Sequence, residues 1–164
     1  MNRSLSIVAL FDYNYWATSQ LLSVASAASH DLFVAPGQFT YRGLRATAVF
    51  ALDVEKSWRQ RLRGEPASVY DEGIDPERFP DVSTLGQAWE DDEAEMRAWL
   101  LDLSVDELSE VVDLGPRDRF PLWMYLVHII THSTQQRRDI ALILERAGHS
   151  PPEIDYLYYA DTLI

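Results

Sequence analysis

The residues with the clearest chemical potential are His128 and His132, which stand four positions apart in a segment with a helical pattern. Residues with this spacing lie on the same face of a helix, one turn apart, so the two imidazoles can bind one metal ion together. Gln136 extends this face by a further turn, although an amide oxygen is a weaker ligand than imidazole for zinc or nickel. On this segment alone, hydrogen-bonded histidines of a core or an interface are the preferred interpretation, and a metal site is the alternative.

Other catalytic motifs are missing from the sequence. Ile129 occupies the place of the catalytic glutamate in a His-Glu-x-x-His zinc motif. No serine lies in a Gly-x-Ser-x-Gly elbow, and no glycine-rich loop could hold a phosphate. The chain has no cysteine, which excludes thiol nucleophiles, disulfides and cysteine-ligated zinc.

The carboxylates follow ordinary helical patterns, with one exception. The acidic run at 90–93 predicts a solvated helix face, because consecutive residues point in different directions. Asp92 differs from its neighbours, since it falls among apolar positions on the inner side of the pattern. Glu55 and Arg59 are four residues apart and predict an ordinary ion pair along one helix.

Four long segments of helical periodicity must position these residues, since their apolar side chains recur at spacings of three, four and seven. Their expected bounds are 4–28, 40–63, 85–103 and 121–147. Thr84–Gln87 and Ser104–Glu107 have the form of capping boxes, and the second predicts a short extra helix to about residue 111. The acidic stretch 65–81 contains prolines and predicts a long surface loop.

The sequence therefore predicts an all-α protein, a four-helix bundle with a short extra helix between the third and fourth long helices. No segment predicts a β-strand, and residues 1–164 are expected to form one domain. Pro121 suits the first position of the last long helix. The tyrosine-rich segment 155–159 is expected to fold back onto the bundle.

The composition excludes several classes of partner. With 26 acidic and 14 basic residues the formal net charge is −12, which argues against binding to nucleic acid or to anionic lipid. No apolar run approaches the roughly 20 residues that a membrane span needs. The N-terminal residues do not resemble a signal peptide, so a cytoplasmic protein is expected.

The order of several short motifs resembles the DinB family, within the DinB/YfiT-like superfamily. The matching motifs are Tyr13-Asn14-Tyr15-Trp16-Ala17, Leu52-Asp53-Val54-Glu55, Pro121-Leu122-Trp123 and Ala147-Gly148-His149-Ser150-Pro151-Pro152. The resemblance covers nearly the whole chain. It implies a four-helix bundle, commonly a homodimer, that often holds a nickel or zinc ion through three histidines. Members include metal-dependent hydrolases and thiol-dependent transferases and isomerases.

Position by position, the resemblance implies a degenerate metal centre. Its three ligand positions correspond to Phe50, His132 and Gln136, so His132 is the one expected histidine that is present. A phenyl ring and an amide cannot replace two imidazoles around a divalent ion. Loss of the metal, with Phe50 filling the space, is the preferred interpretation.

The alternative is a rebuilt ligand set, in which His128 and His132 act with Asp53 or Asp92. The preferred prediction is a small-molecule-binding or non-catalytic homodimer, with no metal cofactor and with a small molecule in a cavity of the bundle. The alternative is a hydrolase or thiol-dependent transferase that uses nickel or zinc, with His132 as ligand or general base.

Overall fold

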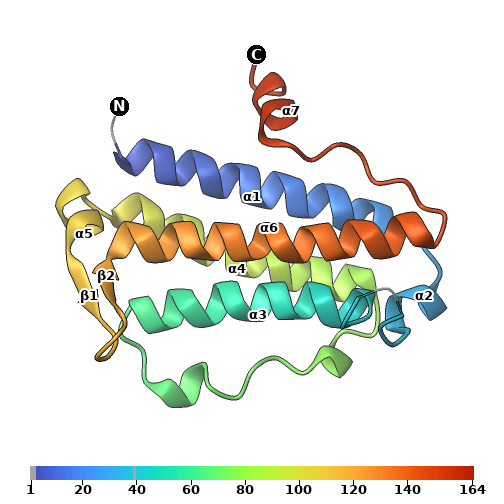
Figure 1. Cartoon of the computed structure of the whole chain (residues 1–164), viewed down its shortest axis with the longest axis horizontal. Helices are drawn as coiled ribbons and strands as arrows, with labels where there is room; N and C mark the ends of the chain where they lie inside the picture. The colour runs from blue at the N-terminus through green and yellow to red at the C-terminus, as the bar shows by residue number, and fades with distance from the viewer. Residues whose placement is uncertain (1–2, 39) are drawn as a thin grey trace.

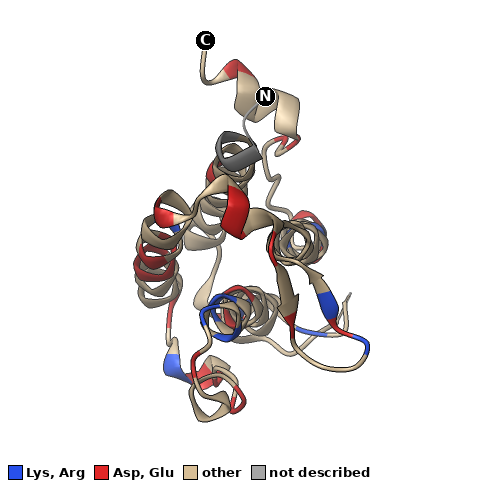
Figure 2. Cartoon of the chain, turned by 90° about the vertical axis from the view of Figure 1, so that its left-hand side faces the viewer, with Lys and Arg blue, Asp and Glu red and all other residues tan. Residues whose placement is uncertain are grey.

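A computed structural model describes residues 3–38 and 40–164, and four long helices form the body of the molecule. They are α1 (Arg3–Ser26), α3 (Leu44–Leu62), α4 (Val82–Asp102) and α6 (Leu122–Arg146). Helices α1 and α3 each contact both α4 and α6, so the four helices form a closed bundle along one long axis (Figure 1). Acidic residues lie on several sides of the molecule in the end-on view of Figure 2. The predicted all-α four-helix bundle is confirmed.

Short elements connect and flank the long helices. They are α2 (His30–Val34), the 3-10 turns η1 (Ala67–Val69) and η2 (Pro76–Arg78), α5 (Val105–Ser109), β1 (Val111–Asp113), β2 (Arg119–Pro121) and α7 (Tyr156–Asp161). Strands β1 and β2 pair antiparallel, with Val112 opposite Phe120. The expectation of no strand was wrong here, because three residues are too few to show an alternating pattern. Among the described residues, none of the helices is long and apolar enough to cross a membrane.

One of the two expected capping boxes is confirmed. The Ser104 hydroxyl accepts from the Glu107 backbone N–H, and the Glu107 carboxylate accepts from the Ser104 N–H in return. The box at Thr84 was wrong, because α4 begins at Val82 and the Asp81 carboxylate accepts from the Thr84 N–H at 2.8 Å. Aspartate caps a helix as well as threonine does, and this one stands three residues earlier in the chain.

Two further helix starts differ from the prediction. Helix α3 begins at Leu44 rather than near residue 40, and the short helix α2 precedes it. Gly43 caps α3 where the chain passes close to α2, since a Cβ built on Gly43 would lie 1.9 Å from the carbonyl oxygen of Ala35. Pro121 is the N-cap of α6 and the last residue of β2, one position before the first helical residue.

The predicted return of the C-terminal segment is confirmed. Tyr13 on α1 packs its ring against the rings of Tyr156 and Tyr159 at 5.3 and 5.9 Å between centroids. The Tyr13 hydroxyl donates to the carbonyl of Ile154 at 2.9 Å. Helix α7 therefore contacts the outer side of α1, and in Figure 1 it stands out from the bundle rather than running along that helix.

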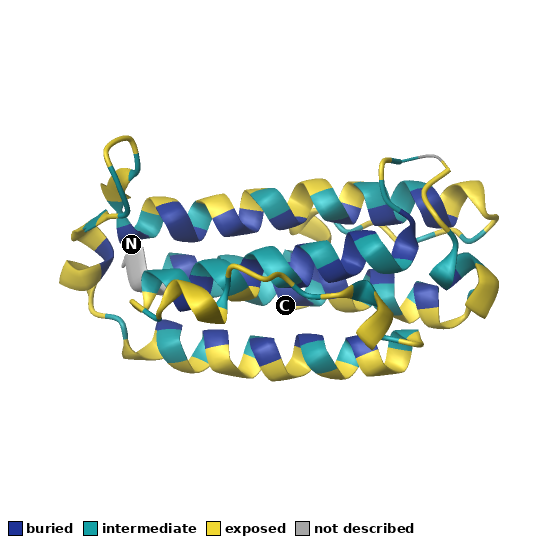
Figure 3. Cartoon of the chain, turned by 90° about the horizontal axis from the view of Figure 1, so that it is seen from below, coloured by how far each residue is buried: buried dark blue, intermediate teal, exposed yellow. Residues whose placement is uncertain are grey.

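The core of the bundle has a polar middle between two apolar ends. Buried positions face the interior of the bundle in Figure 3, and their apolar side chains form two separate clusters. Most of the buried polar side chains of the long helices lie near the middle of the bundle, at or between the boundaries of these two clusters. We call the following set the polar layer: Asn14, Thr18, Glu55, Arg59, Asp92, Ser133 and Arg137.

A buried ion pair joins two helices across the polar layer. The Arg59 guanidinium on α3 donates to the Asp92 carboxylate on α4, and both side chains are almost fully buried. Arg59 also donates to Glu95 at 2.5 Å, whose side chain is largely exposed. The pair explains why Asp92 falls among apolar positions, and it shows that the expected pairing of Arg59 with Glu55 was wrong.

Removing one charge of this pair should destabilise the fold. We expect Asp92→Asn to lower the free energy of unfolding by about 3 kcal/mol, the lower end for a buried pair, because Glu95 still holds Arg59. Urea unfolding at pH 7.5 measures the loss. The neighbouring Asp91→Asn is the matched control, since Asp91 is exposed, and its effect should stay within about 0.5 kcal/mol. Equal losses of unfolding free energy in the two variants would contradict the assignment of Arg59 and Asp92 as a buried ion pair.

Candidate functional site

The three positions that the resemblance assigns to a metal lie where α3 and α6 meet. His132 is half-buried on α6, and the Phe50 ring of α3 meets it edge to face at 5.3 Å between centroids. The Arg42 guanidinium lies 3.8 Å above the centre of the Phe50 ring. Gln136 follows one turn later on α6 and is partly buried. The structure thus brings Phe50 and His132 together, with a cation stacked on the phenyl ring.

The surroundings of His132 favour the neutral form of its imidazole. Burial lowers its pKa, and the nearby His128 and Arg42 lower it further. The Nδ1 atom of His132 is buried and has no hydrogen-bond partner among the described residues. A neutral imidazole can bind a metal, but a phenyl ring and a guanidinium offer it no partner ligand.

The alternative ligand set does not assemble. The rings of His128 and His132 are 6.3 Å apart, and His128 is exposed. Asp92 is bound to Arg59 in the polar layer, and Asp53 is half-buried, with burial raising its pKa. Across residues 3–38 and 40–164, no three His, Cys, Asp or Glu side chains gather as metal ligands would. The donor set therefore does not fit a three-histidine centre, and the absence of a metal cofactor stays a prediction.

A continuous row of rings follows the seam between α3 and α6. Neighbouring ring centroids lie 5.3 to 6.3 Å apart, within the range of favourable aromatic contacts. We call this row the aromatic file, and its members in order are Phe50, His132, His128, Trp58, Tyr125 and Phe120.

One end of the aromatic file opens into a surface pocket of about 460 Å³, here called the aromatic pocket. It is lined by Trp58, Asp118, Phe120, Met124, Tyr125 and His128. The Tyr125 hydroxyl donates to the Asp118 carboxylate at 2.7 Å, and Arg61 pairs with the same carboxylate at 3.3 Å. Burial and the adjacent Asp118 raise the pKa of Tyr125 to about 12, so its phenol stays protonated. The pocket thus combines rings with one anchored carboxylate.

The polar layer contains a second group of chemical interest, Glu55, which the sequence predicted only as an ordinary ion-pair partner of Arg59. The Glu55 carboxylate is fully buried and accepts from the Tyr15 hydroxyl at 2.5 Å and from the Asn14 amide at 3.0 Å. Burial and the nearby Asp92 raise its pKa to about 7. One signal was available, because Glu55 continues the spacing of the buried Ala51 and Leu52 on α3. The residues that contact Glu55 lie on α1, so no pattern of neighbouring residues along α3 indicates them.

Comparison with known proteins gives one clear result. The model of the DinB family matches residues 1–163 of the chain. No curated protein sequence matches it significantly. The matched region covers every residue considered above, including the aromatic pocket and the polar layer.

The raised pKa of Glu55 should make stability depend on pH. Folding favours the protonated carboxyl, so the contribution is fully present below pH 4.5 and is lost as the pH rises through about 7. The contribution of Glu55 to the free energy of unfolding differs by roughly 3 kcal/mol between these two pH limits. We expect Glu55→Gln to remove this fall, because the glutamine oxygen can accept from Asn14 and its amide can donate to Tyr15.

Urea unfolding between pH 4.5 and 8.5 tests this expectation. The difference in unfolding free energy between wild type and Glu55→Gln should change steadily across that range. The exposed Glu72→Gln variant is the matched control and should follow the wild-type curve. A constant difference between wild type and Glu55→Gln would show that the carboxyl titrates alike in the folded and unfolded chains.

Proposed function

The chain belongs to the DinB family, and within that family we propose a non-catalytic, small-molecule-binding protein whose ligand is an organic cation. The aromatic pocket is the binding site. The observation that carries the proposal is the gathering of three aromatic rings and the Asp118 carboxylate around one pocket of about 460 Å³. Rings attract cations through their negatively charged faces. The Asp118 carboxylate adds a negative charge that it shares with Arg61 at 3.3 Å.

The protein's own side chains support a preference for cations on this face. The guanidinium of Arg42 stacks on Phe50, and that of Arg61 lies 5.2 Å from the ring centre of Trp58. Both rings belong to the aromatic file, so two of its members already bind cationic groups. The net charge of −12 draws cations toward the molecule from a distance.

The same features weigh against a divalent metal at the family's ligand positions. Phe50 offers no lone pair, and Gln136 offers an amide oxygen in place of an imidazole. Arg42 covers the Phe50 ring beside His132, so the neighbour of this imidazole carries no lone pair for a metal. A metal-dependent hydrolase or thiol-dependent transferase would need ligands from elsewhere. The homodimer and the cytoplasmic location stay predictions.

A pair of matched probes tests the pocket. We expect benzyltrimethylammonium to bind about 2- to 30-fold more tightly than its uncharged isostere neopentylbenzene, the range that a cation–π contact provides. Isothermal titration calorimetry measures both affinities. Trp58→Leu should abolish the preference for the cation, whereas Tyr158→Leu, an exposed ring on α7, should keep it. Equal affinities for the two probes would contradict a cation site.

A second variant tests the degenerate metal centre. We expect the double variant Phe50→His with Gln136→His to bind about one zinc or nickel ion per chain, because it restores three imidazoles around one position. Elemental mass spectrometry after dialysis, on protein without a histidine tag, measures the ratio. Adding His132→Ala should abolish binding. One metal ion per wild-type chain would instead support a rebuilt ligand set and the enzymatic alternative.

A further inference from the structure

The rings of the aromatic pocket meet at an angle and form a corner. Phe120 stands at 72° to Tyr125 with 5.8 Å between the ring centroids, whereas Trp58 is tilted by 31° to Tyr125 at 5.4 Å. A group placed in this corner meets ring surfaces that face in different directions. The pocket volume of about 460 Å³ lies within the range of small-molecule sites. The corner therefore suits a compact group that offers apolar surface on several sides.

The one carboxylate among the six side chains that line this pocket is already engaged. Asp118 lies in the loop between β1 and β2, and its Oδ1 accepts from the Tyr125 hydroxyl at 2.7 Å. Its Oδ2 accepts from Nη2 of Arg61 on α3 at 3.3 Å. The same Arg61 nitrogen donates to the carbonyl oxygen of Leu114 at 3.4 Å. Two helices thus hold the loop, and each oxygen of the carboxylate already accepts one hydrogen bond.

These hydrogen bonds bear on the kind of cation that the pocket accepts. A primary ammonium has three N–H donors that bind water in solution, and its burial is favourable only where acceptors replace that water. Besides Asp118, the lining side chains offer only neutral acceptors, chiefly the Tyr125 oxygen and a ring nitrogen of His128. A quaternary ammonium has no N–H group, so it loses no such hydrogen bond and packs its methyl groups on the rings.

We propose that the aromatic pocket selects quaternary ammonium compounds over primary ammonium compounds, and that Arg61 and Tyr125 set this preference by engaging the Asp118 oxygens. The inference rests on the proposed cation site and specifies the chemical class of its ligand. Arg61 lies 5.2 Å from the ring centre of Trp58, so it borders the pocket while it holds the carboxylate. Asp118 then attracts a cation by its charge more than by hydrogen bonds.

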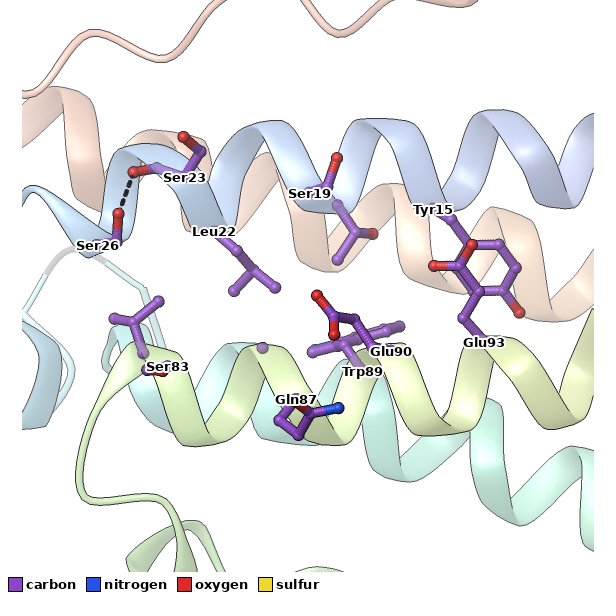
Figure 4. A pocket seen from close by; sticks show the side chains of 13 residues that line it. Tyr15, Ser19, Leu22, Ser23, Ser26, Ser83, Gln87, Trp89, Glu90 and Glu93 are labelled. Atoms are coloured by element: carbon purple, nitrogen blue, oxygen red, sulfur yellow. Dashed lines mark hydrogen bonds between the residues drawn. The ribbon is translucent and has the colours of Figure 1, made fainter.

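A second cavity offers the acceptors that the aromatic pocket lacks. It is a groove of about 430 Å³ between α1 and α4, and none of its lining residues is a lysine or an arginine. Its wall carries serine hydroxyls and two carboxylates, which belong to Ser19, Ser23, Ser26, Ser83, Glu90 and Glu93 (Figure 4). A primary ammonium finds oxygen acceptors there. Because Trp58 lines the aromatic pocket and Trp89 lines the groove, the two indole groups report on the two cavities separately.

Nuclear magnetic resonance titration of the full chain with benzyltrimethylammonium and benzylammonium tests the proposal. At neutral pH the two probes share the benzyl group and one positive charge, and they differ in N–H donors and methyl groups. Read from the Trp58 indole signal, the quaternary probe should bind about tenfold or more tightly, the ratio expected when a hydrogen bond to an ion is lost. Binding in the groove shifts the Trp89 signal instead and does not enter this ratio.

Variants that free the acceptors should weaken the preference. Arg61→Met releases Asp118 Oδ2 and the Leu114 carbonyl, so the ratio of the two affinities should fall about threefold or more. Both probes carry one charge, so the loss of the guanidinium charge affects them alike and cancels in the ratio. Tyr125→Phe releases Oδ1 at constant charge and should also lower the ratio. Arg63→Met, at an exposed position two residues further along the chain, should keep the wild-type ratio.

The outcomes separate this inference from the cation site on which it rests. If benzylammonium binds at Trp58 as tightly as the quaternary probe, and both bind more tightly than neopentylbenzene, the preference is overturned and the cation site stands. If neither cation shifts the Trp58 signal, the cation site and the inference both fail. A ratio that stays at the wild-type value in both Arg61→Met and Tyr125→Phe would overturn the role assigned to these two side chains.

Discussion

The buried pairing of Arg59 with Asp92 is the interaction on which the arrangement of the bundle depends. A charged side chain inside the protein must meet its partner, since an unpaired buried charge costs several kcal/mol. The pair therefore fixes how far α3 and α4 can slide against each other. Asn14 on α1 donates to Glu55 on α3 and accepts from Arg137 on α6. These two hydrogen bonds restrict how α1 and α6 can slide against α3. Apolar clusters on either side of the polar layer contribute cohesion, which is less sensitive to register.

The position of the aromatic file follows from this register. Glu55 and Arg59 point from α3 into the polar layer, whereas Phe50 and Trp58 lie along its seam with α6. Fixing the buried side of α3 thus fixes where its rings meet His128 and His132. The strands β1 and β2 complete the aromatic pocket, because the segment around them supplies Asp118 and Phe120. One helix in this way serves an ionic interior and an aromatic outer face.

The sequence predicted those features that depend on neighbouring positions in the chain. Helical periodicity placed the long helices, and the spacing of His128 and His132 put them side by side. The resemblance assigned Phe50 and His132 to two ligand positions of one metal centre, and their rings lie 5.3 Å apart between centroids. The contacts of Glu55 with Tyr15 and of Arg137 with Asn14 span 40 and 123 positions, and no local pattern indicates them. Local reasoning chose the nearer partner for Arg59, whereas burial placed the more distant Asp92 beside it.

The central claim is that the face between α3 and α6 binds an organic cation through its rings, in place of a metal held by histidines. Nuclear magnetic resonance of the indole and imidazole groups tests it most directly, with benzyltrimethylammonium and zinc titrated separately. The account predicts that the organic cation shifts the Trp58 and His128 signals to saturation, and that zinc leaves the His132 signals unsaturated. Saturation of His132 at one zinc per chain, with no response to the organic cation, would contradict it.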